Sequence, residues 1–292
     1  MDGYLEGSMS HPSPFRCSRR AAVRSSVFGV LAVSLPRLVQ AHQVFTLPPV
    51  DPERRYPAIA DEEVSEVVGA SHFDLDRVRE LVDARPELAR ATWDWAFGDW
   101  ESALGAASHV GRRDIATYLI DKGARPDLFT YAMLGHHQAV QAMVEARPGV
   151  QRITGPHGIS LLLHARAGEG AQGLSATQRA ACERTVAYLE QLGDADPRQP
   201  HLPLTAEEKQ AYLGDYRYGE GPQDGFTVQL NMRELLSLGR LGGFGGALYR
   251  QAPDVFVYNG TPSVEVRFTR ENGAVRSLTV HEPGLVVQAV KV

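Results

Sequence analysis

Serine and lysine side chains at fixed spacings carry out the chemistry of many hydrolases. Lysine occurs only as Lys122, Lys209 and Lys291, and none of them lies three residues after a serine, so S-x-x-K is absent. The segment GISLL at 158–162 begins like G-x-S-x-G but ends in leucine. No H-E-x-x-H motif or phosphate-binding P-loop occurs. The sequence therefore predicts no catalytic residue, no cofactor-binding residue and no enzyme activity.

Histidines are the side chains most able to bind a metal ion. His136 and His137 are adjacent, and neighbouring residues on a helix point about 100° apart, so they seldom bind one ion together. A solvent-facing or helix-capping position is favoured for this pair. His109 and His164 fall on apolar helical segments and are expected to pack between helices. No metal site is predicted.

All three tryptophans occur in one short segment, ATWDWAFGDW at 91–100. Trp93, Trp95 and Trp100 could pack inside the helical stack beside Phe97, or bridge to the C-terminal β module. Alternatively they could be exposed, and exposed tryptophan is a typical hot-spot residue in protein interfaces. The three tryptophans are the candidate partner-binding residues.

The elements around this segment are short helices. Residues 102–127 predict two helices, and Gly111 and Gly123 follow them at positions where a left-handed residue ends a helix. This stretch resembles an ankyrin repeat: Ser102-Ala103-Leu104 stands for T-P-L, and Leu119-Ile120 stands for the Leu pair. The resemblance implies a stack of helical repeats that binds a protein partner through its finger loops.

Residues 61–200 contain further helical segments of the same kind. Four imperfect units follow one another, although the turn glycines Gly111 and Gly135 are only 24 residues apart, whereas the family period is about 33. We therefore expect an ankyrin-like repeat domain over 61–200. A stack of helical hairpins unrelated to this family is the alternative.

Residues 203–292 change to the period of two that is typical of strands. Asn259-Gly260 and Asn272-Gly273 are hairpin turn pairs. This predicts a small antiparallel β barrel or sandwich, so the expected fold class is α+β with several domains. The pattern Tyr212-x-Gly214-x-Tyr216 at its start resembles the small β domain that follows the catalytic domain of bacterial beta-lactamase-like serine hydrolases. The resemblance includes no catalytic motif.

The N-terminal region resembles an export signal. Arg19 and Arg20 follow Ser18 as in the twin-arginine motif, and a short apolar run follows them. Residues 1–41 are predicted to be this signal, and 42–60 a proline-rich linker; a disordered arginine-rich leader is the alternative. The apolar run is too short to span a bilayer, so no stable membrane anchor is expected once the signal is removed.

The formal net charge of −5 gives no basic field for nucleic acid, and no nucleic-acid partner is expected. Together these features predict a periplasmic or otherwise exported bacterial protein that recognises a protein partner without catalysis. The alternative function is ligand binding, or service as a hydrolase accessory, through the C-terminal β domain. That alternative predicts a barrel mouth lined by aromatic side chains: Tyr216, Tyr218, Phe226 and Tyr249. A third possibility is an enzyme of unrecognised type, which converging buried carboxylate and histidine side chains would favour.

Overall fold

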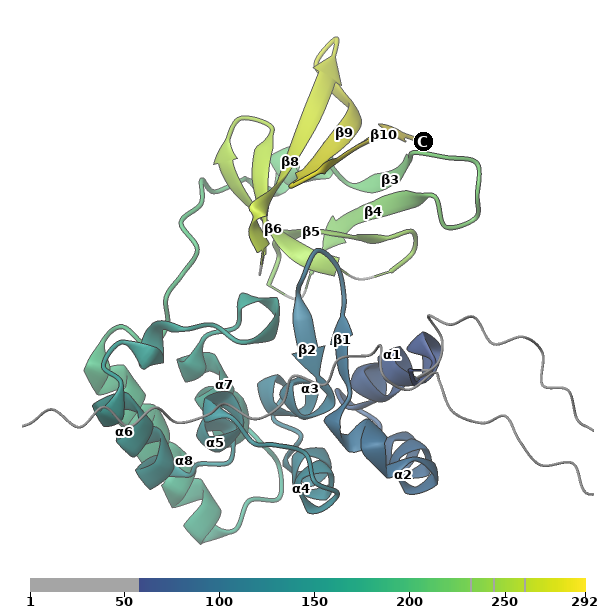
Figure 1. The fold of residues 1–292 in the computed structure, drawn as a ribbon. Coiled ribbons are helices and arrows are strands. Elements are labelled where there is room, and N and C mark those ends of the chain that lie inside the picture. Colours follow the sequence, from purple (N-terminus) through teal and green to yellow (C-terminus); the bar gives the residue numbers. More distant parts are fainter. Residues whose placement is uncertain (1–57, 232, 244, 260) are drawn as a thin grey trace, which may run out of the picture. The chain divides into compact units, whose positions relative to one another are not determined.

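The structure is a computed structural model that describes residues 58–292 except 232, 244 and 260. The described residues form nine α-helices and a closed eight-stranded barrel (Figure 1). The export signal predicted for 1–41 lies outside the described residues, as does nearly all of the linker at 42–60. Within the described part, no helix has the length and apolarity needed to cross a membrane.

The helices occur mainly in consecutive pairs. Their bounds are α1 (Asp61–Ala70), α2 (Leu75–Ala84), α3 (Ala103–His109), α4 (Arg113–Asp121), α5 (Leu128–Met133), α6 (His137–Ala146), α7 (Leu161–Glu169), α8 (Ala176–Leu192) and α9 (Ala206–Gln210). Between them lie three 3-10 segments, η2 (Pro86–Arg90), η3 (Val150–Arg152) and η4 (Pro156–Gly158). A two-stranded antiparallel hairpin, β1 (Thr92–Asp94) with β2 (Trp100–Ser102), connects η2 to α3.

Side-chain oxygens satisfy the free backbone N–H groups at many helix starts. Asp74 accepts from Arg77 N at 3.0 Å, and Ser102 accepts from Gly105 N at 2.9 Å. Ser175 begins α8 with a reciprocal capping box. These caps fix where α2, α3 and α8 begin, and so they fix the ends of the loops that lie just before these helices.

Small residues allow the helices to approach closely. The buried residues Ala103, Ala106 and Ala107 of α3 have no measurable exposure. Gly168 of α7 lies against the backbone of α5, where a Cβ atom would stand 1.8 Å from the carbonyl oxygen of Met133. Backbone-to-backbone contact between α5 and α7 therefore depends on the absence of a side chain at 168.

The predicted ankyrin-repeat stack is wrong. The helix pairs do not repeat one unit: α3 and α4 have 7 and 9 residues, whereas α7 and α8 have 9 and 17. The β1–β2 hairpin precedes α3, while α5 follows α4 after a short turn and η4 precedes α7. A glycine after a helix indicates only where that helix ends. A helix–glycine–helix pattern therefore does not require successive helix pairs to be copies of one structural unit.

The C-terminal strands confirm the predicted α+β class and show that the β region is a barrel. The strands are β3 (Gly214–Arg217), β4 (Gly225–Leu230), β5 (Leu236–Arg240), β6 (Gly245–Ala252), β7 (Val255–Tyr258), β8 (Thr261–Glu271), β9 (Ala274–Glu282) and β10 (Leu285–Lys291). All neighbours are antiparallel, and β10 pairs with both β9 and β3, which closes the barrel. Asn272 and Gly273 form the β8–β9 turn with φ of 50° and 83°, as a two-residue hairpin requires.

Aromatic side chains fill the barrel. The rings of Tyr212, Tyr216, Phe256 and Phe268 are buried and meet edge to face at centroid distances of 4.8 to 5.9 Å. Phe97, from the tip of the β1–β2 hairpin, also packs on this core, with its ring 5.0 Å from that of Tyr258. The backbone oxygen of Phe97 accepts a hydrogen bond from Thr261 Oγ1 at 2.8 Å. The hairpin tip is thus held in place from one side by the barrel.

Candidate functional site

The structure separates the three tryptophans that the sequence analysis grouped together. Trp93 and Trp95 are half-buried and pack against the helical core. Trp100, at the start of β2, is 62% exposed. Of the three candidate partner-binding residues, Trp100 therefore has most of its ring free to meet a partner.

The loop that presents Trp100 is held by several hydrogen bonds. Asp94 accepts from Gly98 N at 2.9 Å across the turn, and Trp95 Nε1 donates to Glu101 Oε2 at 2.6 Å. With Phe97 fixed against the barrel, the loop at 95–99 is anchored on two sides. Trp100 is consequently an exposed aromatic side chain on a backbone with little freedom.

A recess of about 300 Å³ lies beside Trp100. Two aromatic side chains and two carboxylates are among the residues that line it, together with small residues from two loops: Gly98, Asp99, Trp100, Ser102, Gly105, Asp127, Phe129, Thr154, Gly155 and Pro156. Asp127 caps α5 by accepting from Thr130 N at 2.9 Å. The recess thus combines aromatic surface with negative charge.

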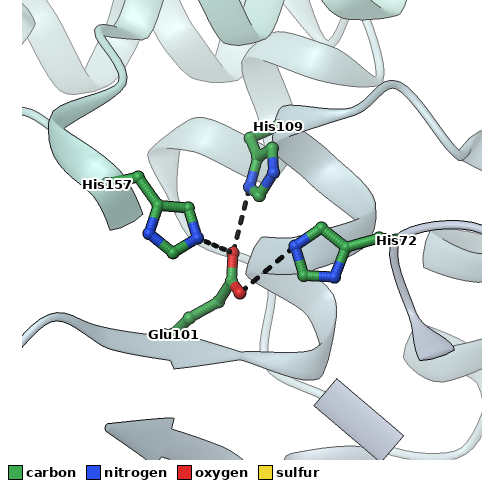
Figure 2. A group of neighbouring side chains, drawn as sticks. All are labelled: His72, Glu101, His109 and His157. Carbon is green, nitrogen blue, oxygen red and sulfur yellow. Dashed lines mark ion pairs between the residues drawn. The ribbon is translucent and has the colours of Figure 1, made fainter. Parts of the chain in front are cut away.

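Next to these loops, three histidines surround one glutamate (Figure 2). They come from four segments: His72 from the turn after α1, Glu101 from β2, His109 from the end of α3 and His157 from η4. Glu101 Oε1 lies 3.0 Å from His109 Nδ1 and 3.4 Å from His157 Nε2, while Oε2 lies 3.4 Å from His72 Nε2. We call these four residues the His/Glu cluster.

Contacts behind the cluster orient two of its rings. His157 Nδ1 lies 2.8 Å from Asp99 Oδ2, and the other oxygen of Asp99 accepts from His157 N at 2.9 Å. His72 Nδ1 lies 3.0 Å from the carbonyl oxygen of Gly69. A carbonyl or carboxylate at Nδ1 places the ring proton there. Nε2 of each ring then faces Glu101.

Burial and neighbouring charges shift the pKa values of residues in the cluster. Burial alone would raise the pKa of Glu101, but contacts with His109 and His157 outweigh it and hold this pKa well below its usual range. Burial alone would lower the pKa of His157, yet the carboxylates of Asp99 and Glu101 raise it to about 10. For His72, burial dominates and lowers the pKa. Glu101 is therefore an anion held in the protein interior by imidazole groups.

No sequence pattern predicts this cluster. His109 is predicted only as a helix-packing residue, and none of His72, Glu101 and His157 is among the candidate residues. The four positions have no recognisable spacing, because each lies on a separate segment that only the tertiary fold brings together. His136 and His137 lie elsewhere, at the start of α6, and neither belongs to the cluster.

Ligand binding through the β domain predicted an aromatic barrel mouth, but the residues predicted to line it have different environments. Tyr216 is completely buried, and its hydroxyl donates to the carbonyl oxygen of Tyr212 at 2.6 Å. Tyr249 is 7% exposed. Tyr218 is 46% exposed and its ring lies 5.1 Å from that of Phe226. Tyr216 thus contributes to the barrel core, while Tyr218 remains at the surface.

Comparisons with known proteins show no family for this chain. No family model matches it, and no curated protein matches it. A crystal structure of SurE matches this chain at 24% sequence identity and a TM-score of 0.23. The match covers 40% of this chain and 27% of the SurE chain. A TM-score this low supports no argument about fold or activity. Both resemblances are wrong: the described residues form helix pairs of unequal length and a closed eight-stranded barrel, not an ankyrin repeat stack followed by the β domain of serine hydrolases.

Proposed function

We propose that this chain is a recognition protein that binds another protein through Trp100 and the adjoining recess. The observation that supports the proposal most is the 62% exposure of Trp100 on a loop anchored from two sides. A large aromatic side chain on a rigid backbone loses little conformational entropy on binding, which is why such residues act as hot spots.

The lining of the recess supports one kind of partner. Asp127 lines it, and Trp100 and Phe129 add aromatic faces. An arginine side chain suits these surroundings, because its guanidinium both pairs with carboxylates and stacks on aromatic rings. The proposed partner is thus a protein segment that places an arginine in the recess while its neighbouring residues cover Trp100.

The test is capture of the partner by wild-type protein and by a Trp100→Ala variant, from extract of the cells that make the protein. We expect the variant to lose at least about tenfold in affinity, since truncating a hot-spot residue costs about 2 kcal/mol or more. Phe73→Ala is the matched control, because Phe73 is 70% exposed but lies outside the recess.

The proposal fails if Trp100→Ala and Phe73→Ala retain the same partners at the same affinity. Trp93 and Trp95 are unsuitable for this comparison, because both pack on the helical core and their truncation would also affect stability. Export to the periplasm remains a prediction from the sequence, and amino-terminal sequencing of the mature protein would test it.

A further inference from the structure

The His/Glu cluster has the composition of a transition-metal site. Three imidazoles and one carboxylate are ligands that Zn²⁺ and its neighbours in the first transition series accept. In His72, Glu101, His109 and His157, the four potential ligand atoms all lie within 4.8 Å of one another. These four residues could therefore hold one metal ion.

The distances within the cluster fit ligands around a small ion. At metal–ligand bonds of 2.0–2.1 Å, two ligands of a tetrahedral site stand about 3.3 Å apart. The three contacts from the carboxylate of Glu101 to the imidazoles are 3.0, 3.4 and 3.4 Å. Two of these exceed the usual range of 2.7–3.2 Å for an N–H···O hydrogen bond. The spacing suits two ligands sharing an ion better than it suits direct hydrogen bonds.

Two buried atoms of the cluster have no well-aligned hydrogen-bonding partner within the described part of the chain. Glu101 Oε1 and His109 Nδ1 are shielded from solvent and lie 3.0 Å apart, yet among the described residues no aligned hydrogen bond joins them or satisfies either one elsewhere. Native proteins rarely leave buried polar atoms in this condition, and an unplaced ion is one recognised explanation. Both atoms are in the positions that metal ligands would have.

The surrounding contacts are those that metal-bound histidines usually make. A histidine that binds a metal typically donates its other ring N–H to a carboxylate or a backbone carbonyl, which fixes the tautomer and aims the free nitrogen at the ion. His157 has Asp99 in this role, and His72 has the carbonyl of Gly69. Trp95 Nε1 restrains the carboxylate of Glu101 in the same way.

Charge also favours a divalent cation. Asp99 is 4% exposed and Glu101 is completely buried, so two carboxylates lie in the interior within reach of His157. Buried charges require a partner of opposite sign. A protonated His157 offsets only one of these two negative charges, whereas a divalent cation bound to three neutral imidazoles would balance both.

From this geometry we propose that His72, Glu101, His109 and His157 bind one divalent transition-metal ion, with Zn²⁺ as the reference ion. Asp99 and Trp95 are positioning residues for the site. The four ligands come from the turn after α1, from β2, from α3 and from η4. The bound ion therefore joins the segments on both sides of the β1–β2 hairpin. This inference does not depend on the proposed recognition function.

The test uses the full chain, freed of metal by a chelator that is then removed, and titrated with Zn²⁺ in a calorimeter. We expect one ion per chain for the wild type. His72→Ala removes a ligand at the solvent edge, where the side chain is 22% exposed, and it should weaken binding at least about tenfold. Asp99→Asn should weaken binding by about 10- to 100-fold, the usual effect of losing an outer contact to a ligand.

His136→Ala is the matched control, because His136 is an exposed histidine outside the cluster. This variant should bind Zn²⁺ like the wild type. Far-UV circular dichroism first establishes that each variant is folded. Binding that is absent in the wild type, or unchanged in His72→Ala, overturns the proposal.

A second measurement needs no variant. X-ray absorption of the Zn²⁺-loaded wild type should show three imidazole ligands and one oxygen ligand from the protein. A spectrum with fewer than two imidazoles would place the ion elsewhere, and it would overturn the assignment even if the titration gave one ion per chain.

Discussion

Gly168→Ala is expected to destabilise the protein by about 3 kcal/mol or more, the upper end of the cost of overpacking a core. The added Cβ atom would stand 1.8 Å from the carbonyl oxygen of Met133 and 2.6 Å from its carbonyl carbon. These are backbone atoms, so no side-chain rotation can relieve the clash, and α7 would have to move away from α5. Urea unfolding followed by far-UV circular dichroism measures the change in unfolding free energy.

Gly170→Ala provides the control for this experiment. Gly170 ends the same helix with φ of −75° and ψ of −5°, which alanine adopts readily, and a Cβ atom there would meet its nearest neighbour at 3.4 Å. We expect its unfolding free energy to change by less than about 1 kcal/mol. Equal losses in the two variants would contradict the argument that close approach of α5 and α7 sets the requirement for glycine.

Acid should destabilise the wild-type protein more than a His164→Phe variant. His164 is fully buried; its Nδ1 lies 2.8 Å from the carbonyl oxygen of Ser160, and its Nε2 has no hydrogen-bonding partner among residues 58–292 as far as the structure describes them. Burial is the main cause that lowers the pKa of His164 from 6.5 to about 4. Because the folded pKa is below the unfolded one, the unfolded chain binds the proton first as the pH falls.

The sign and the window of this effect follow from those two values. Above pH 6.5 the histidine is neutral in both states and contributes no pH dependence. Between pH 6.5 and about 4 the folded state loses stability, and the total loss below that range is about 3 kcal/mol. The variant lacks this term but keeps the aromatic contact with Phe129, whose ring lies 4.7 Å from that of His164.

The measurement is the unfolding free energy of both proteins at several pH values, with a chelator present so that bound metal does not contribute. Other titrating groups are common to the two proteins, so the difference between the curves isolates His164. The difference should move in favour of the variant as the pH falls from 6.5 to 4. Parallel curves over this range would show that His164 is protonated without penalty.

Local signals in the sequence predicted much of the secondary structure. The change from helical periodicity to a period of two predicted helices followed by an antiparallel β region, and the structure confirms this organisation. Asn272-Gly273 predicted a hairpin turn, since both residues tolerate positive φ, and the turn is present between β8 and β9. Capping residues, turn pairs and periodicity act over a few residues, and a sequence displays them directly.

Arrangements that depend on distant segments were not predictable in this way. Glycines after helices resembled a repeat family, but they report where a helix ends and contain no information on how helices stack. The choice between barrel and sandwich depended on whether β10 pairs with β3, a contact across more than seventy residues. The His/Glu cluster needed four segments to converge, so no spacing between its members could reveal it.

The pairing of β10 with β3 also affects how the barrel forms during synthesis. β3 is among the first residues of the barrel to leave the ribosome, and its partner on one side, β10, is the last of the eight strands to be made. Until then β3 and β9 each present an open edge, and open edges pair readily with other chains. The nascent barrel is thus exposed to misassociation until its final strand emerges. A chain whose translation ends before Leu285 would lack β10, and its remaining strands could not close the barrel.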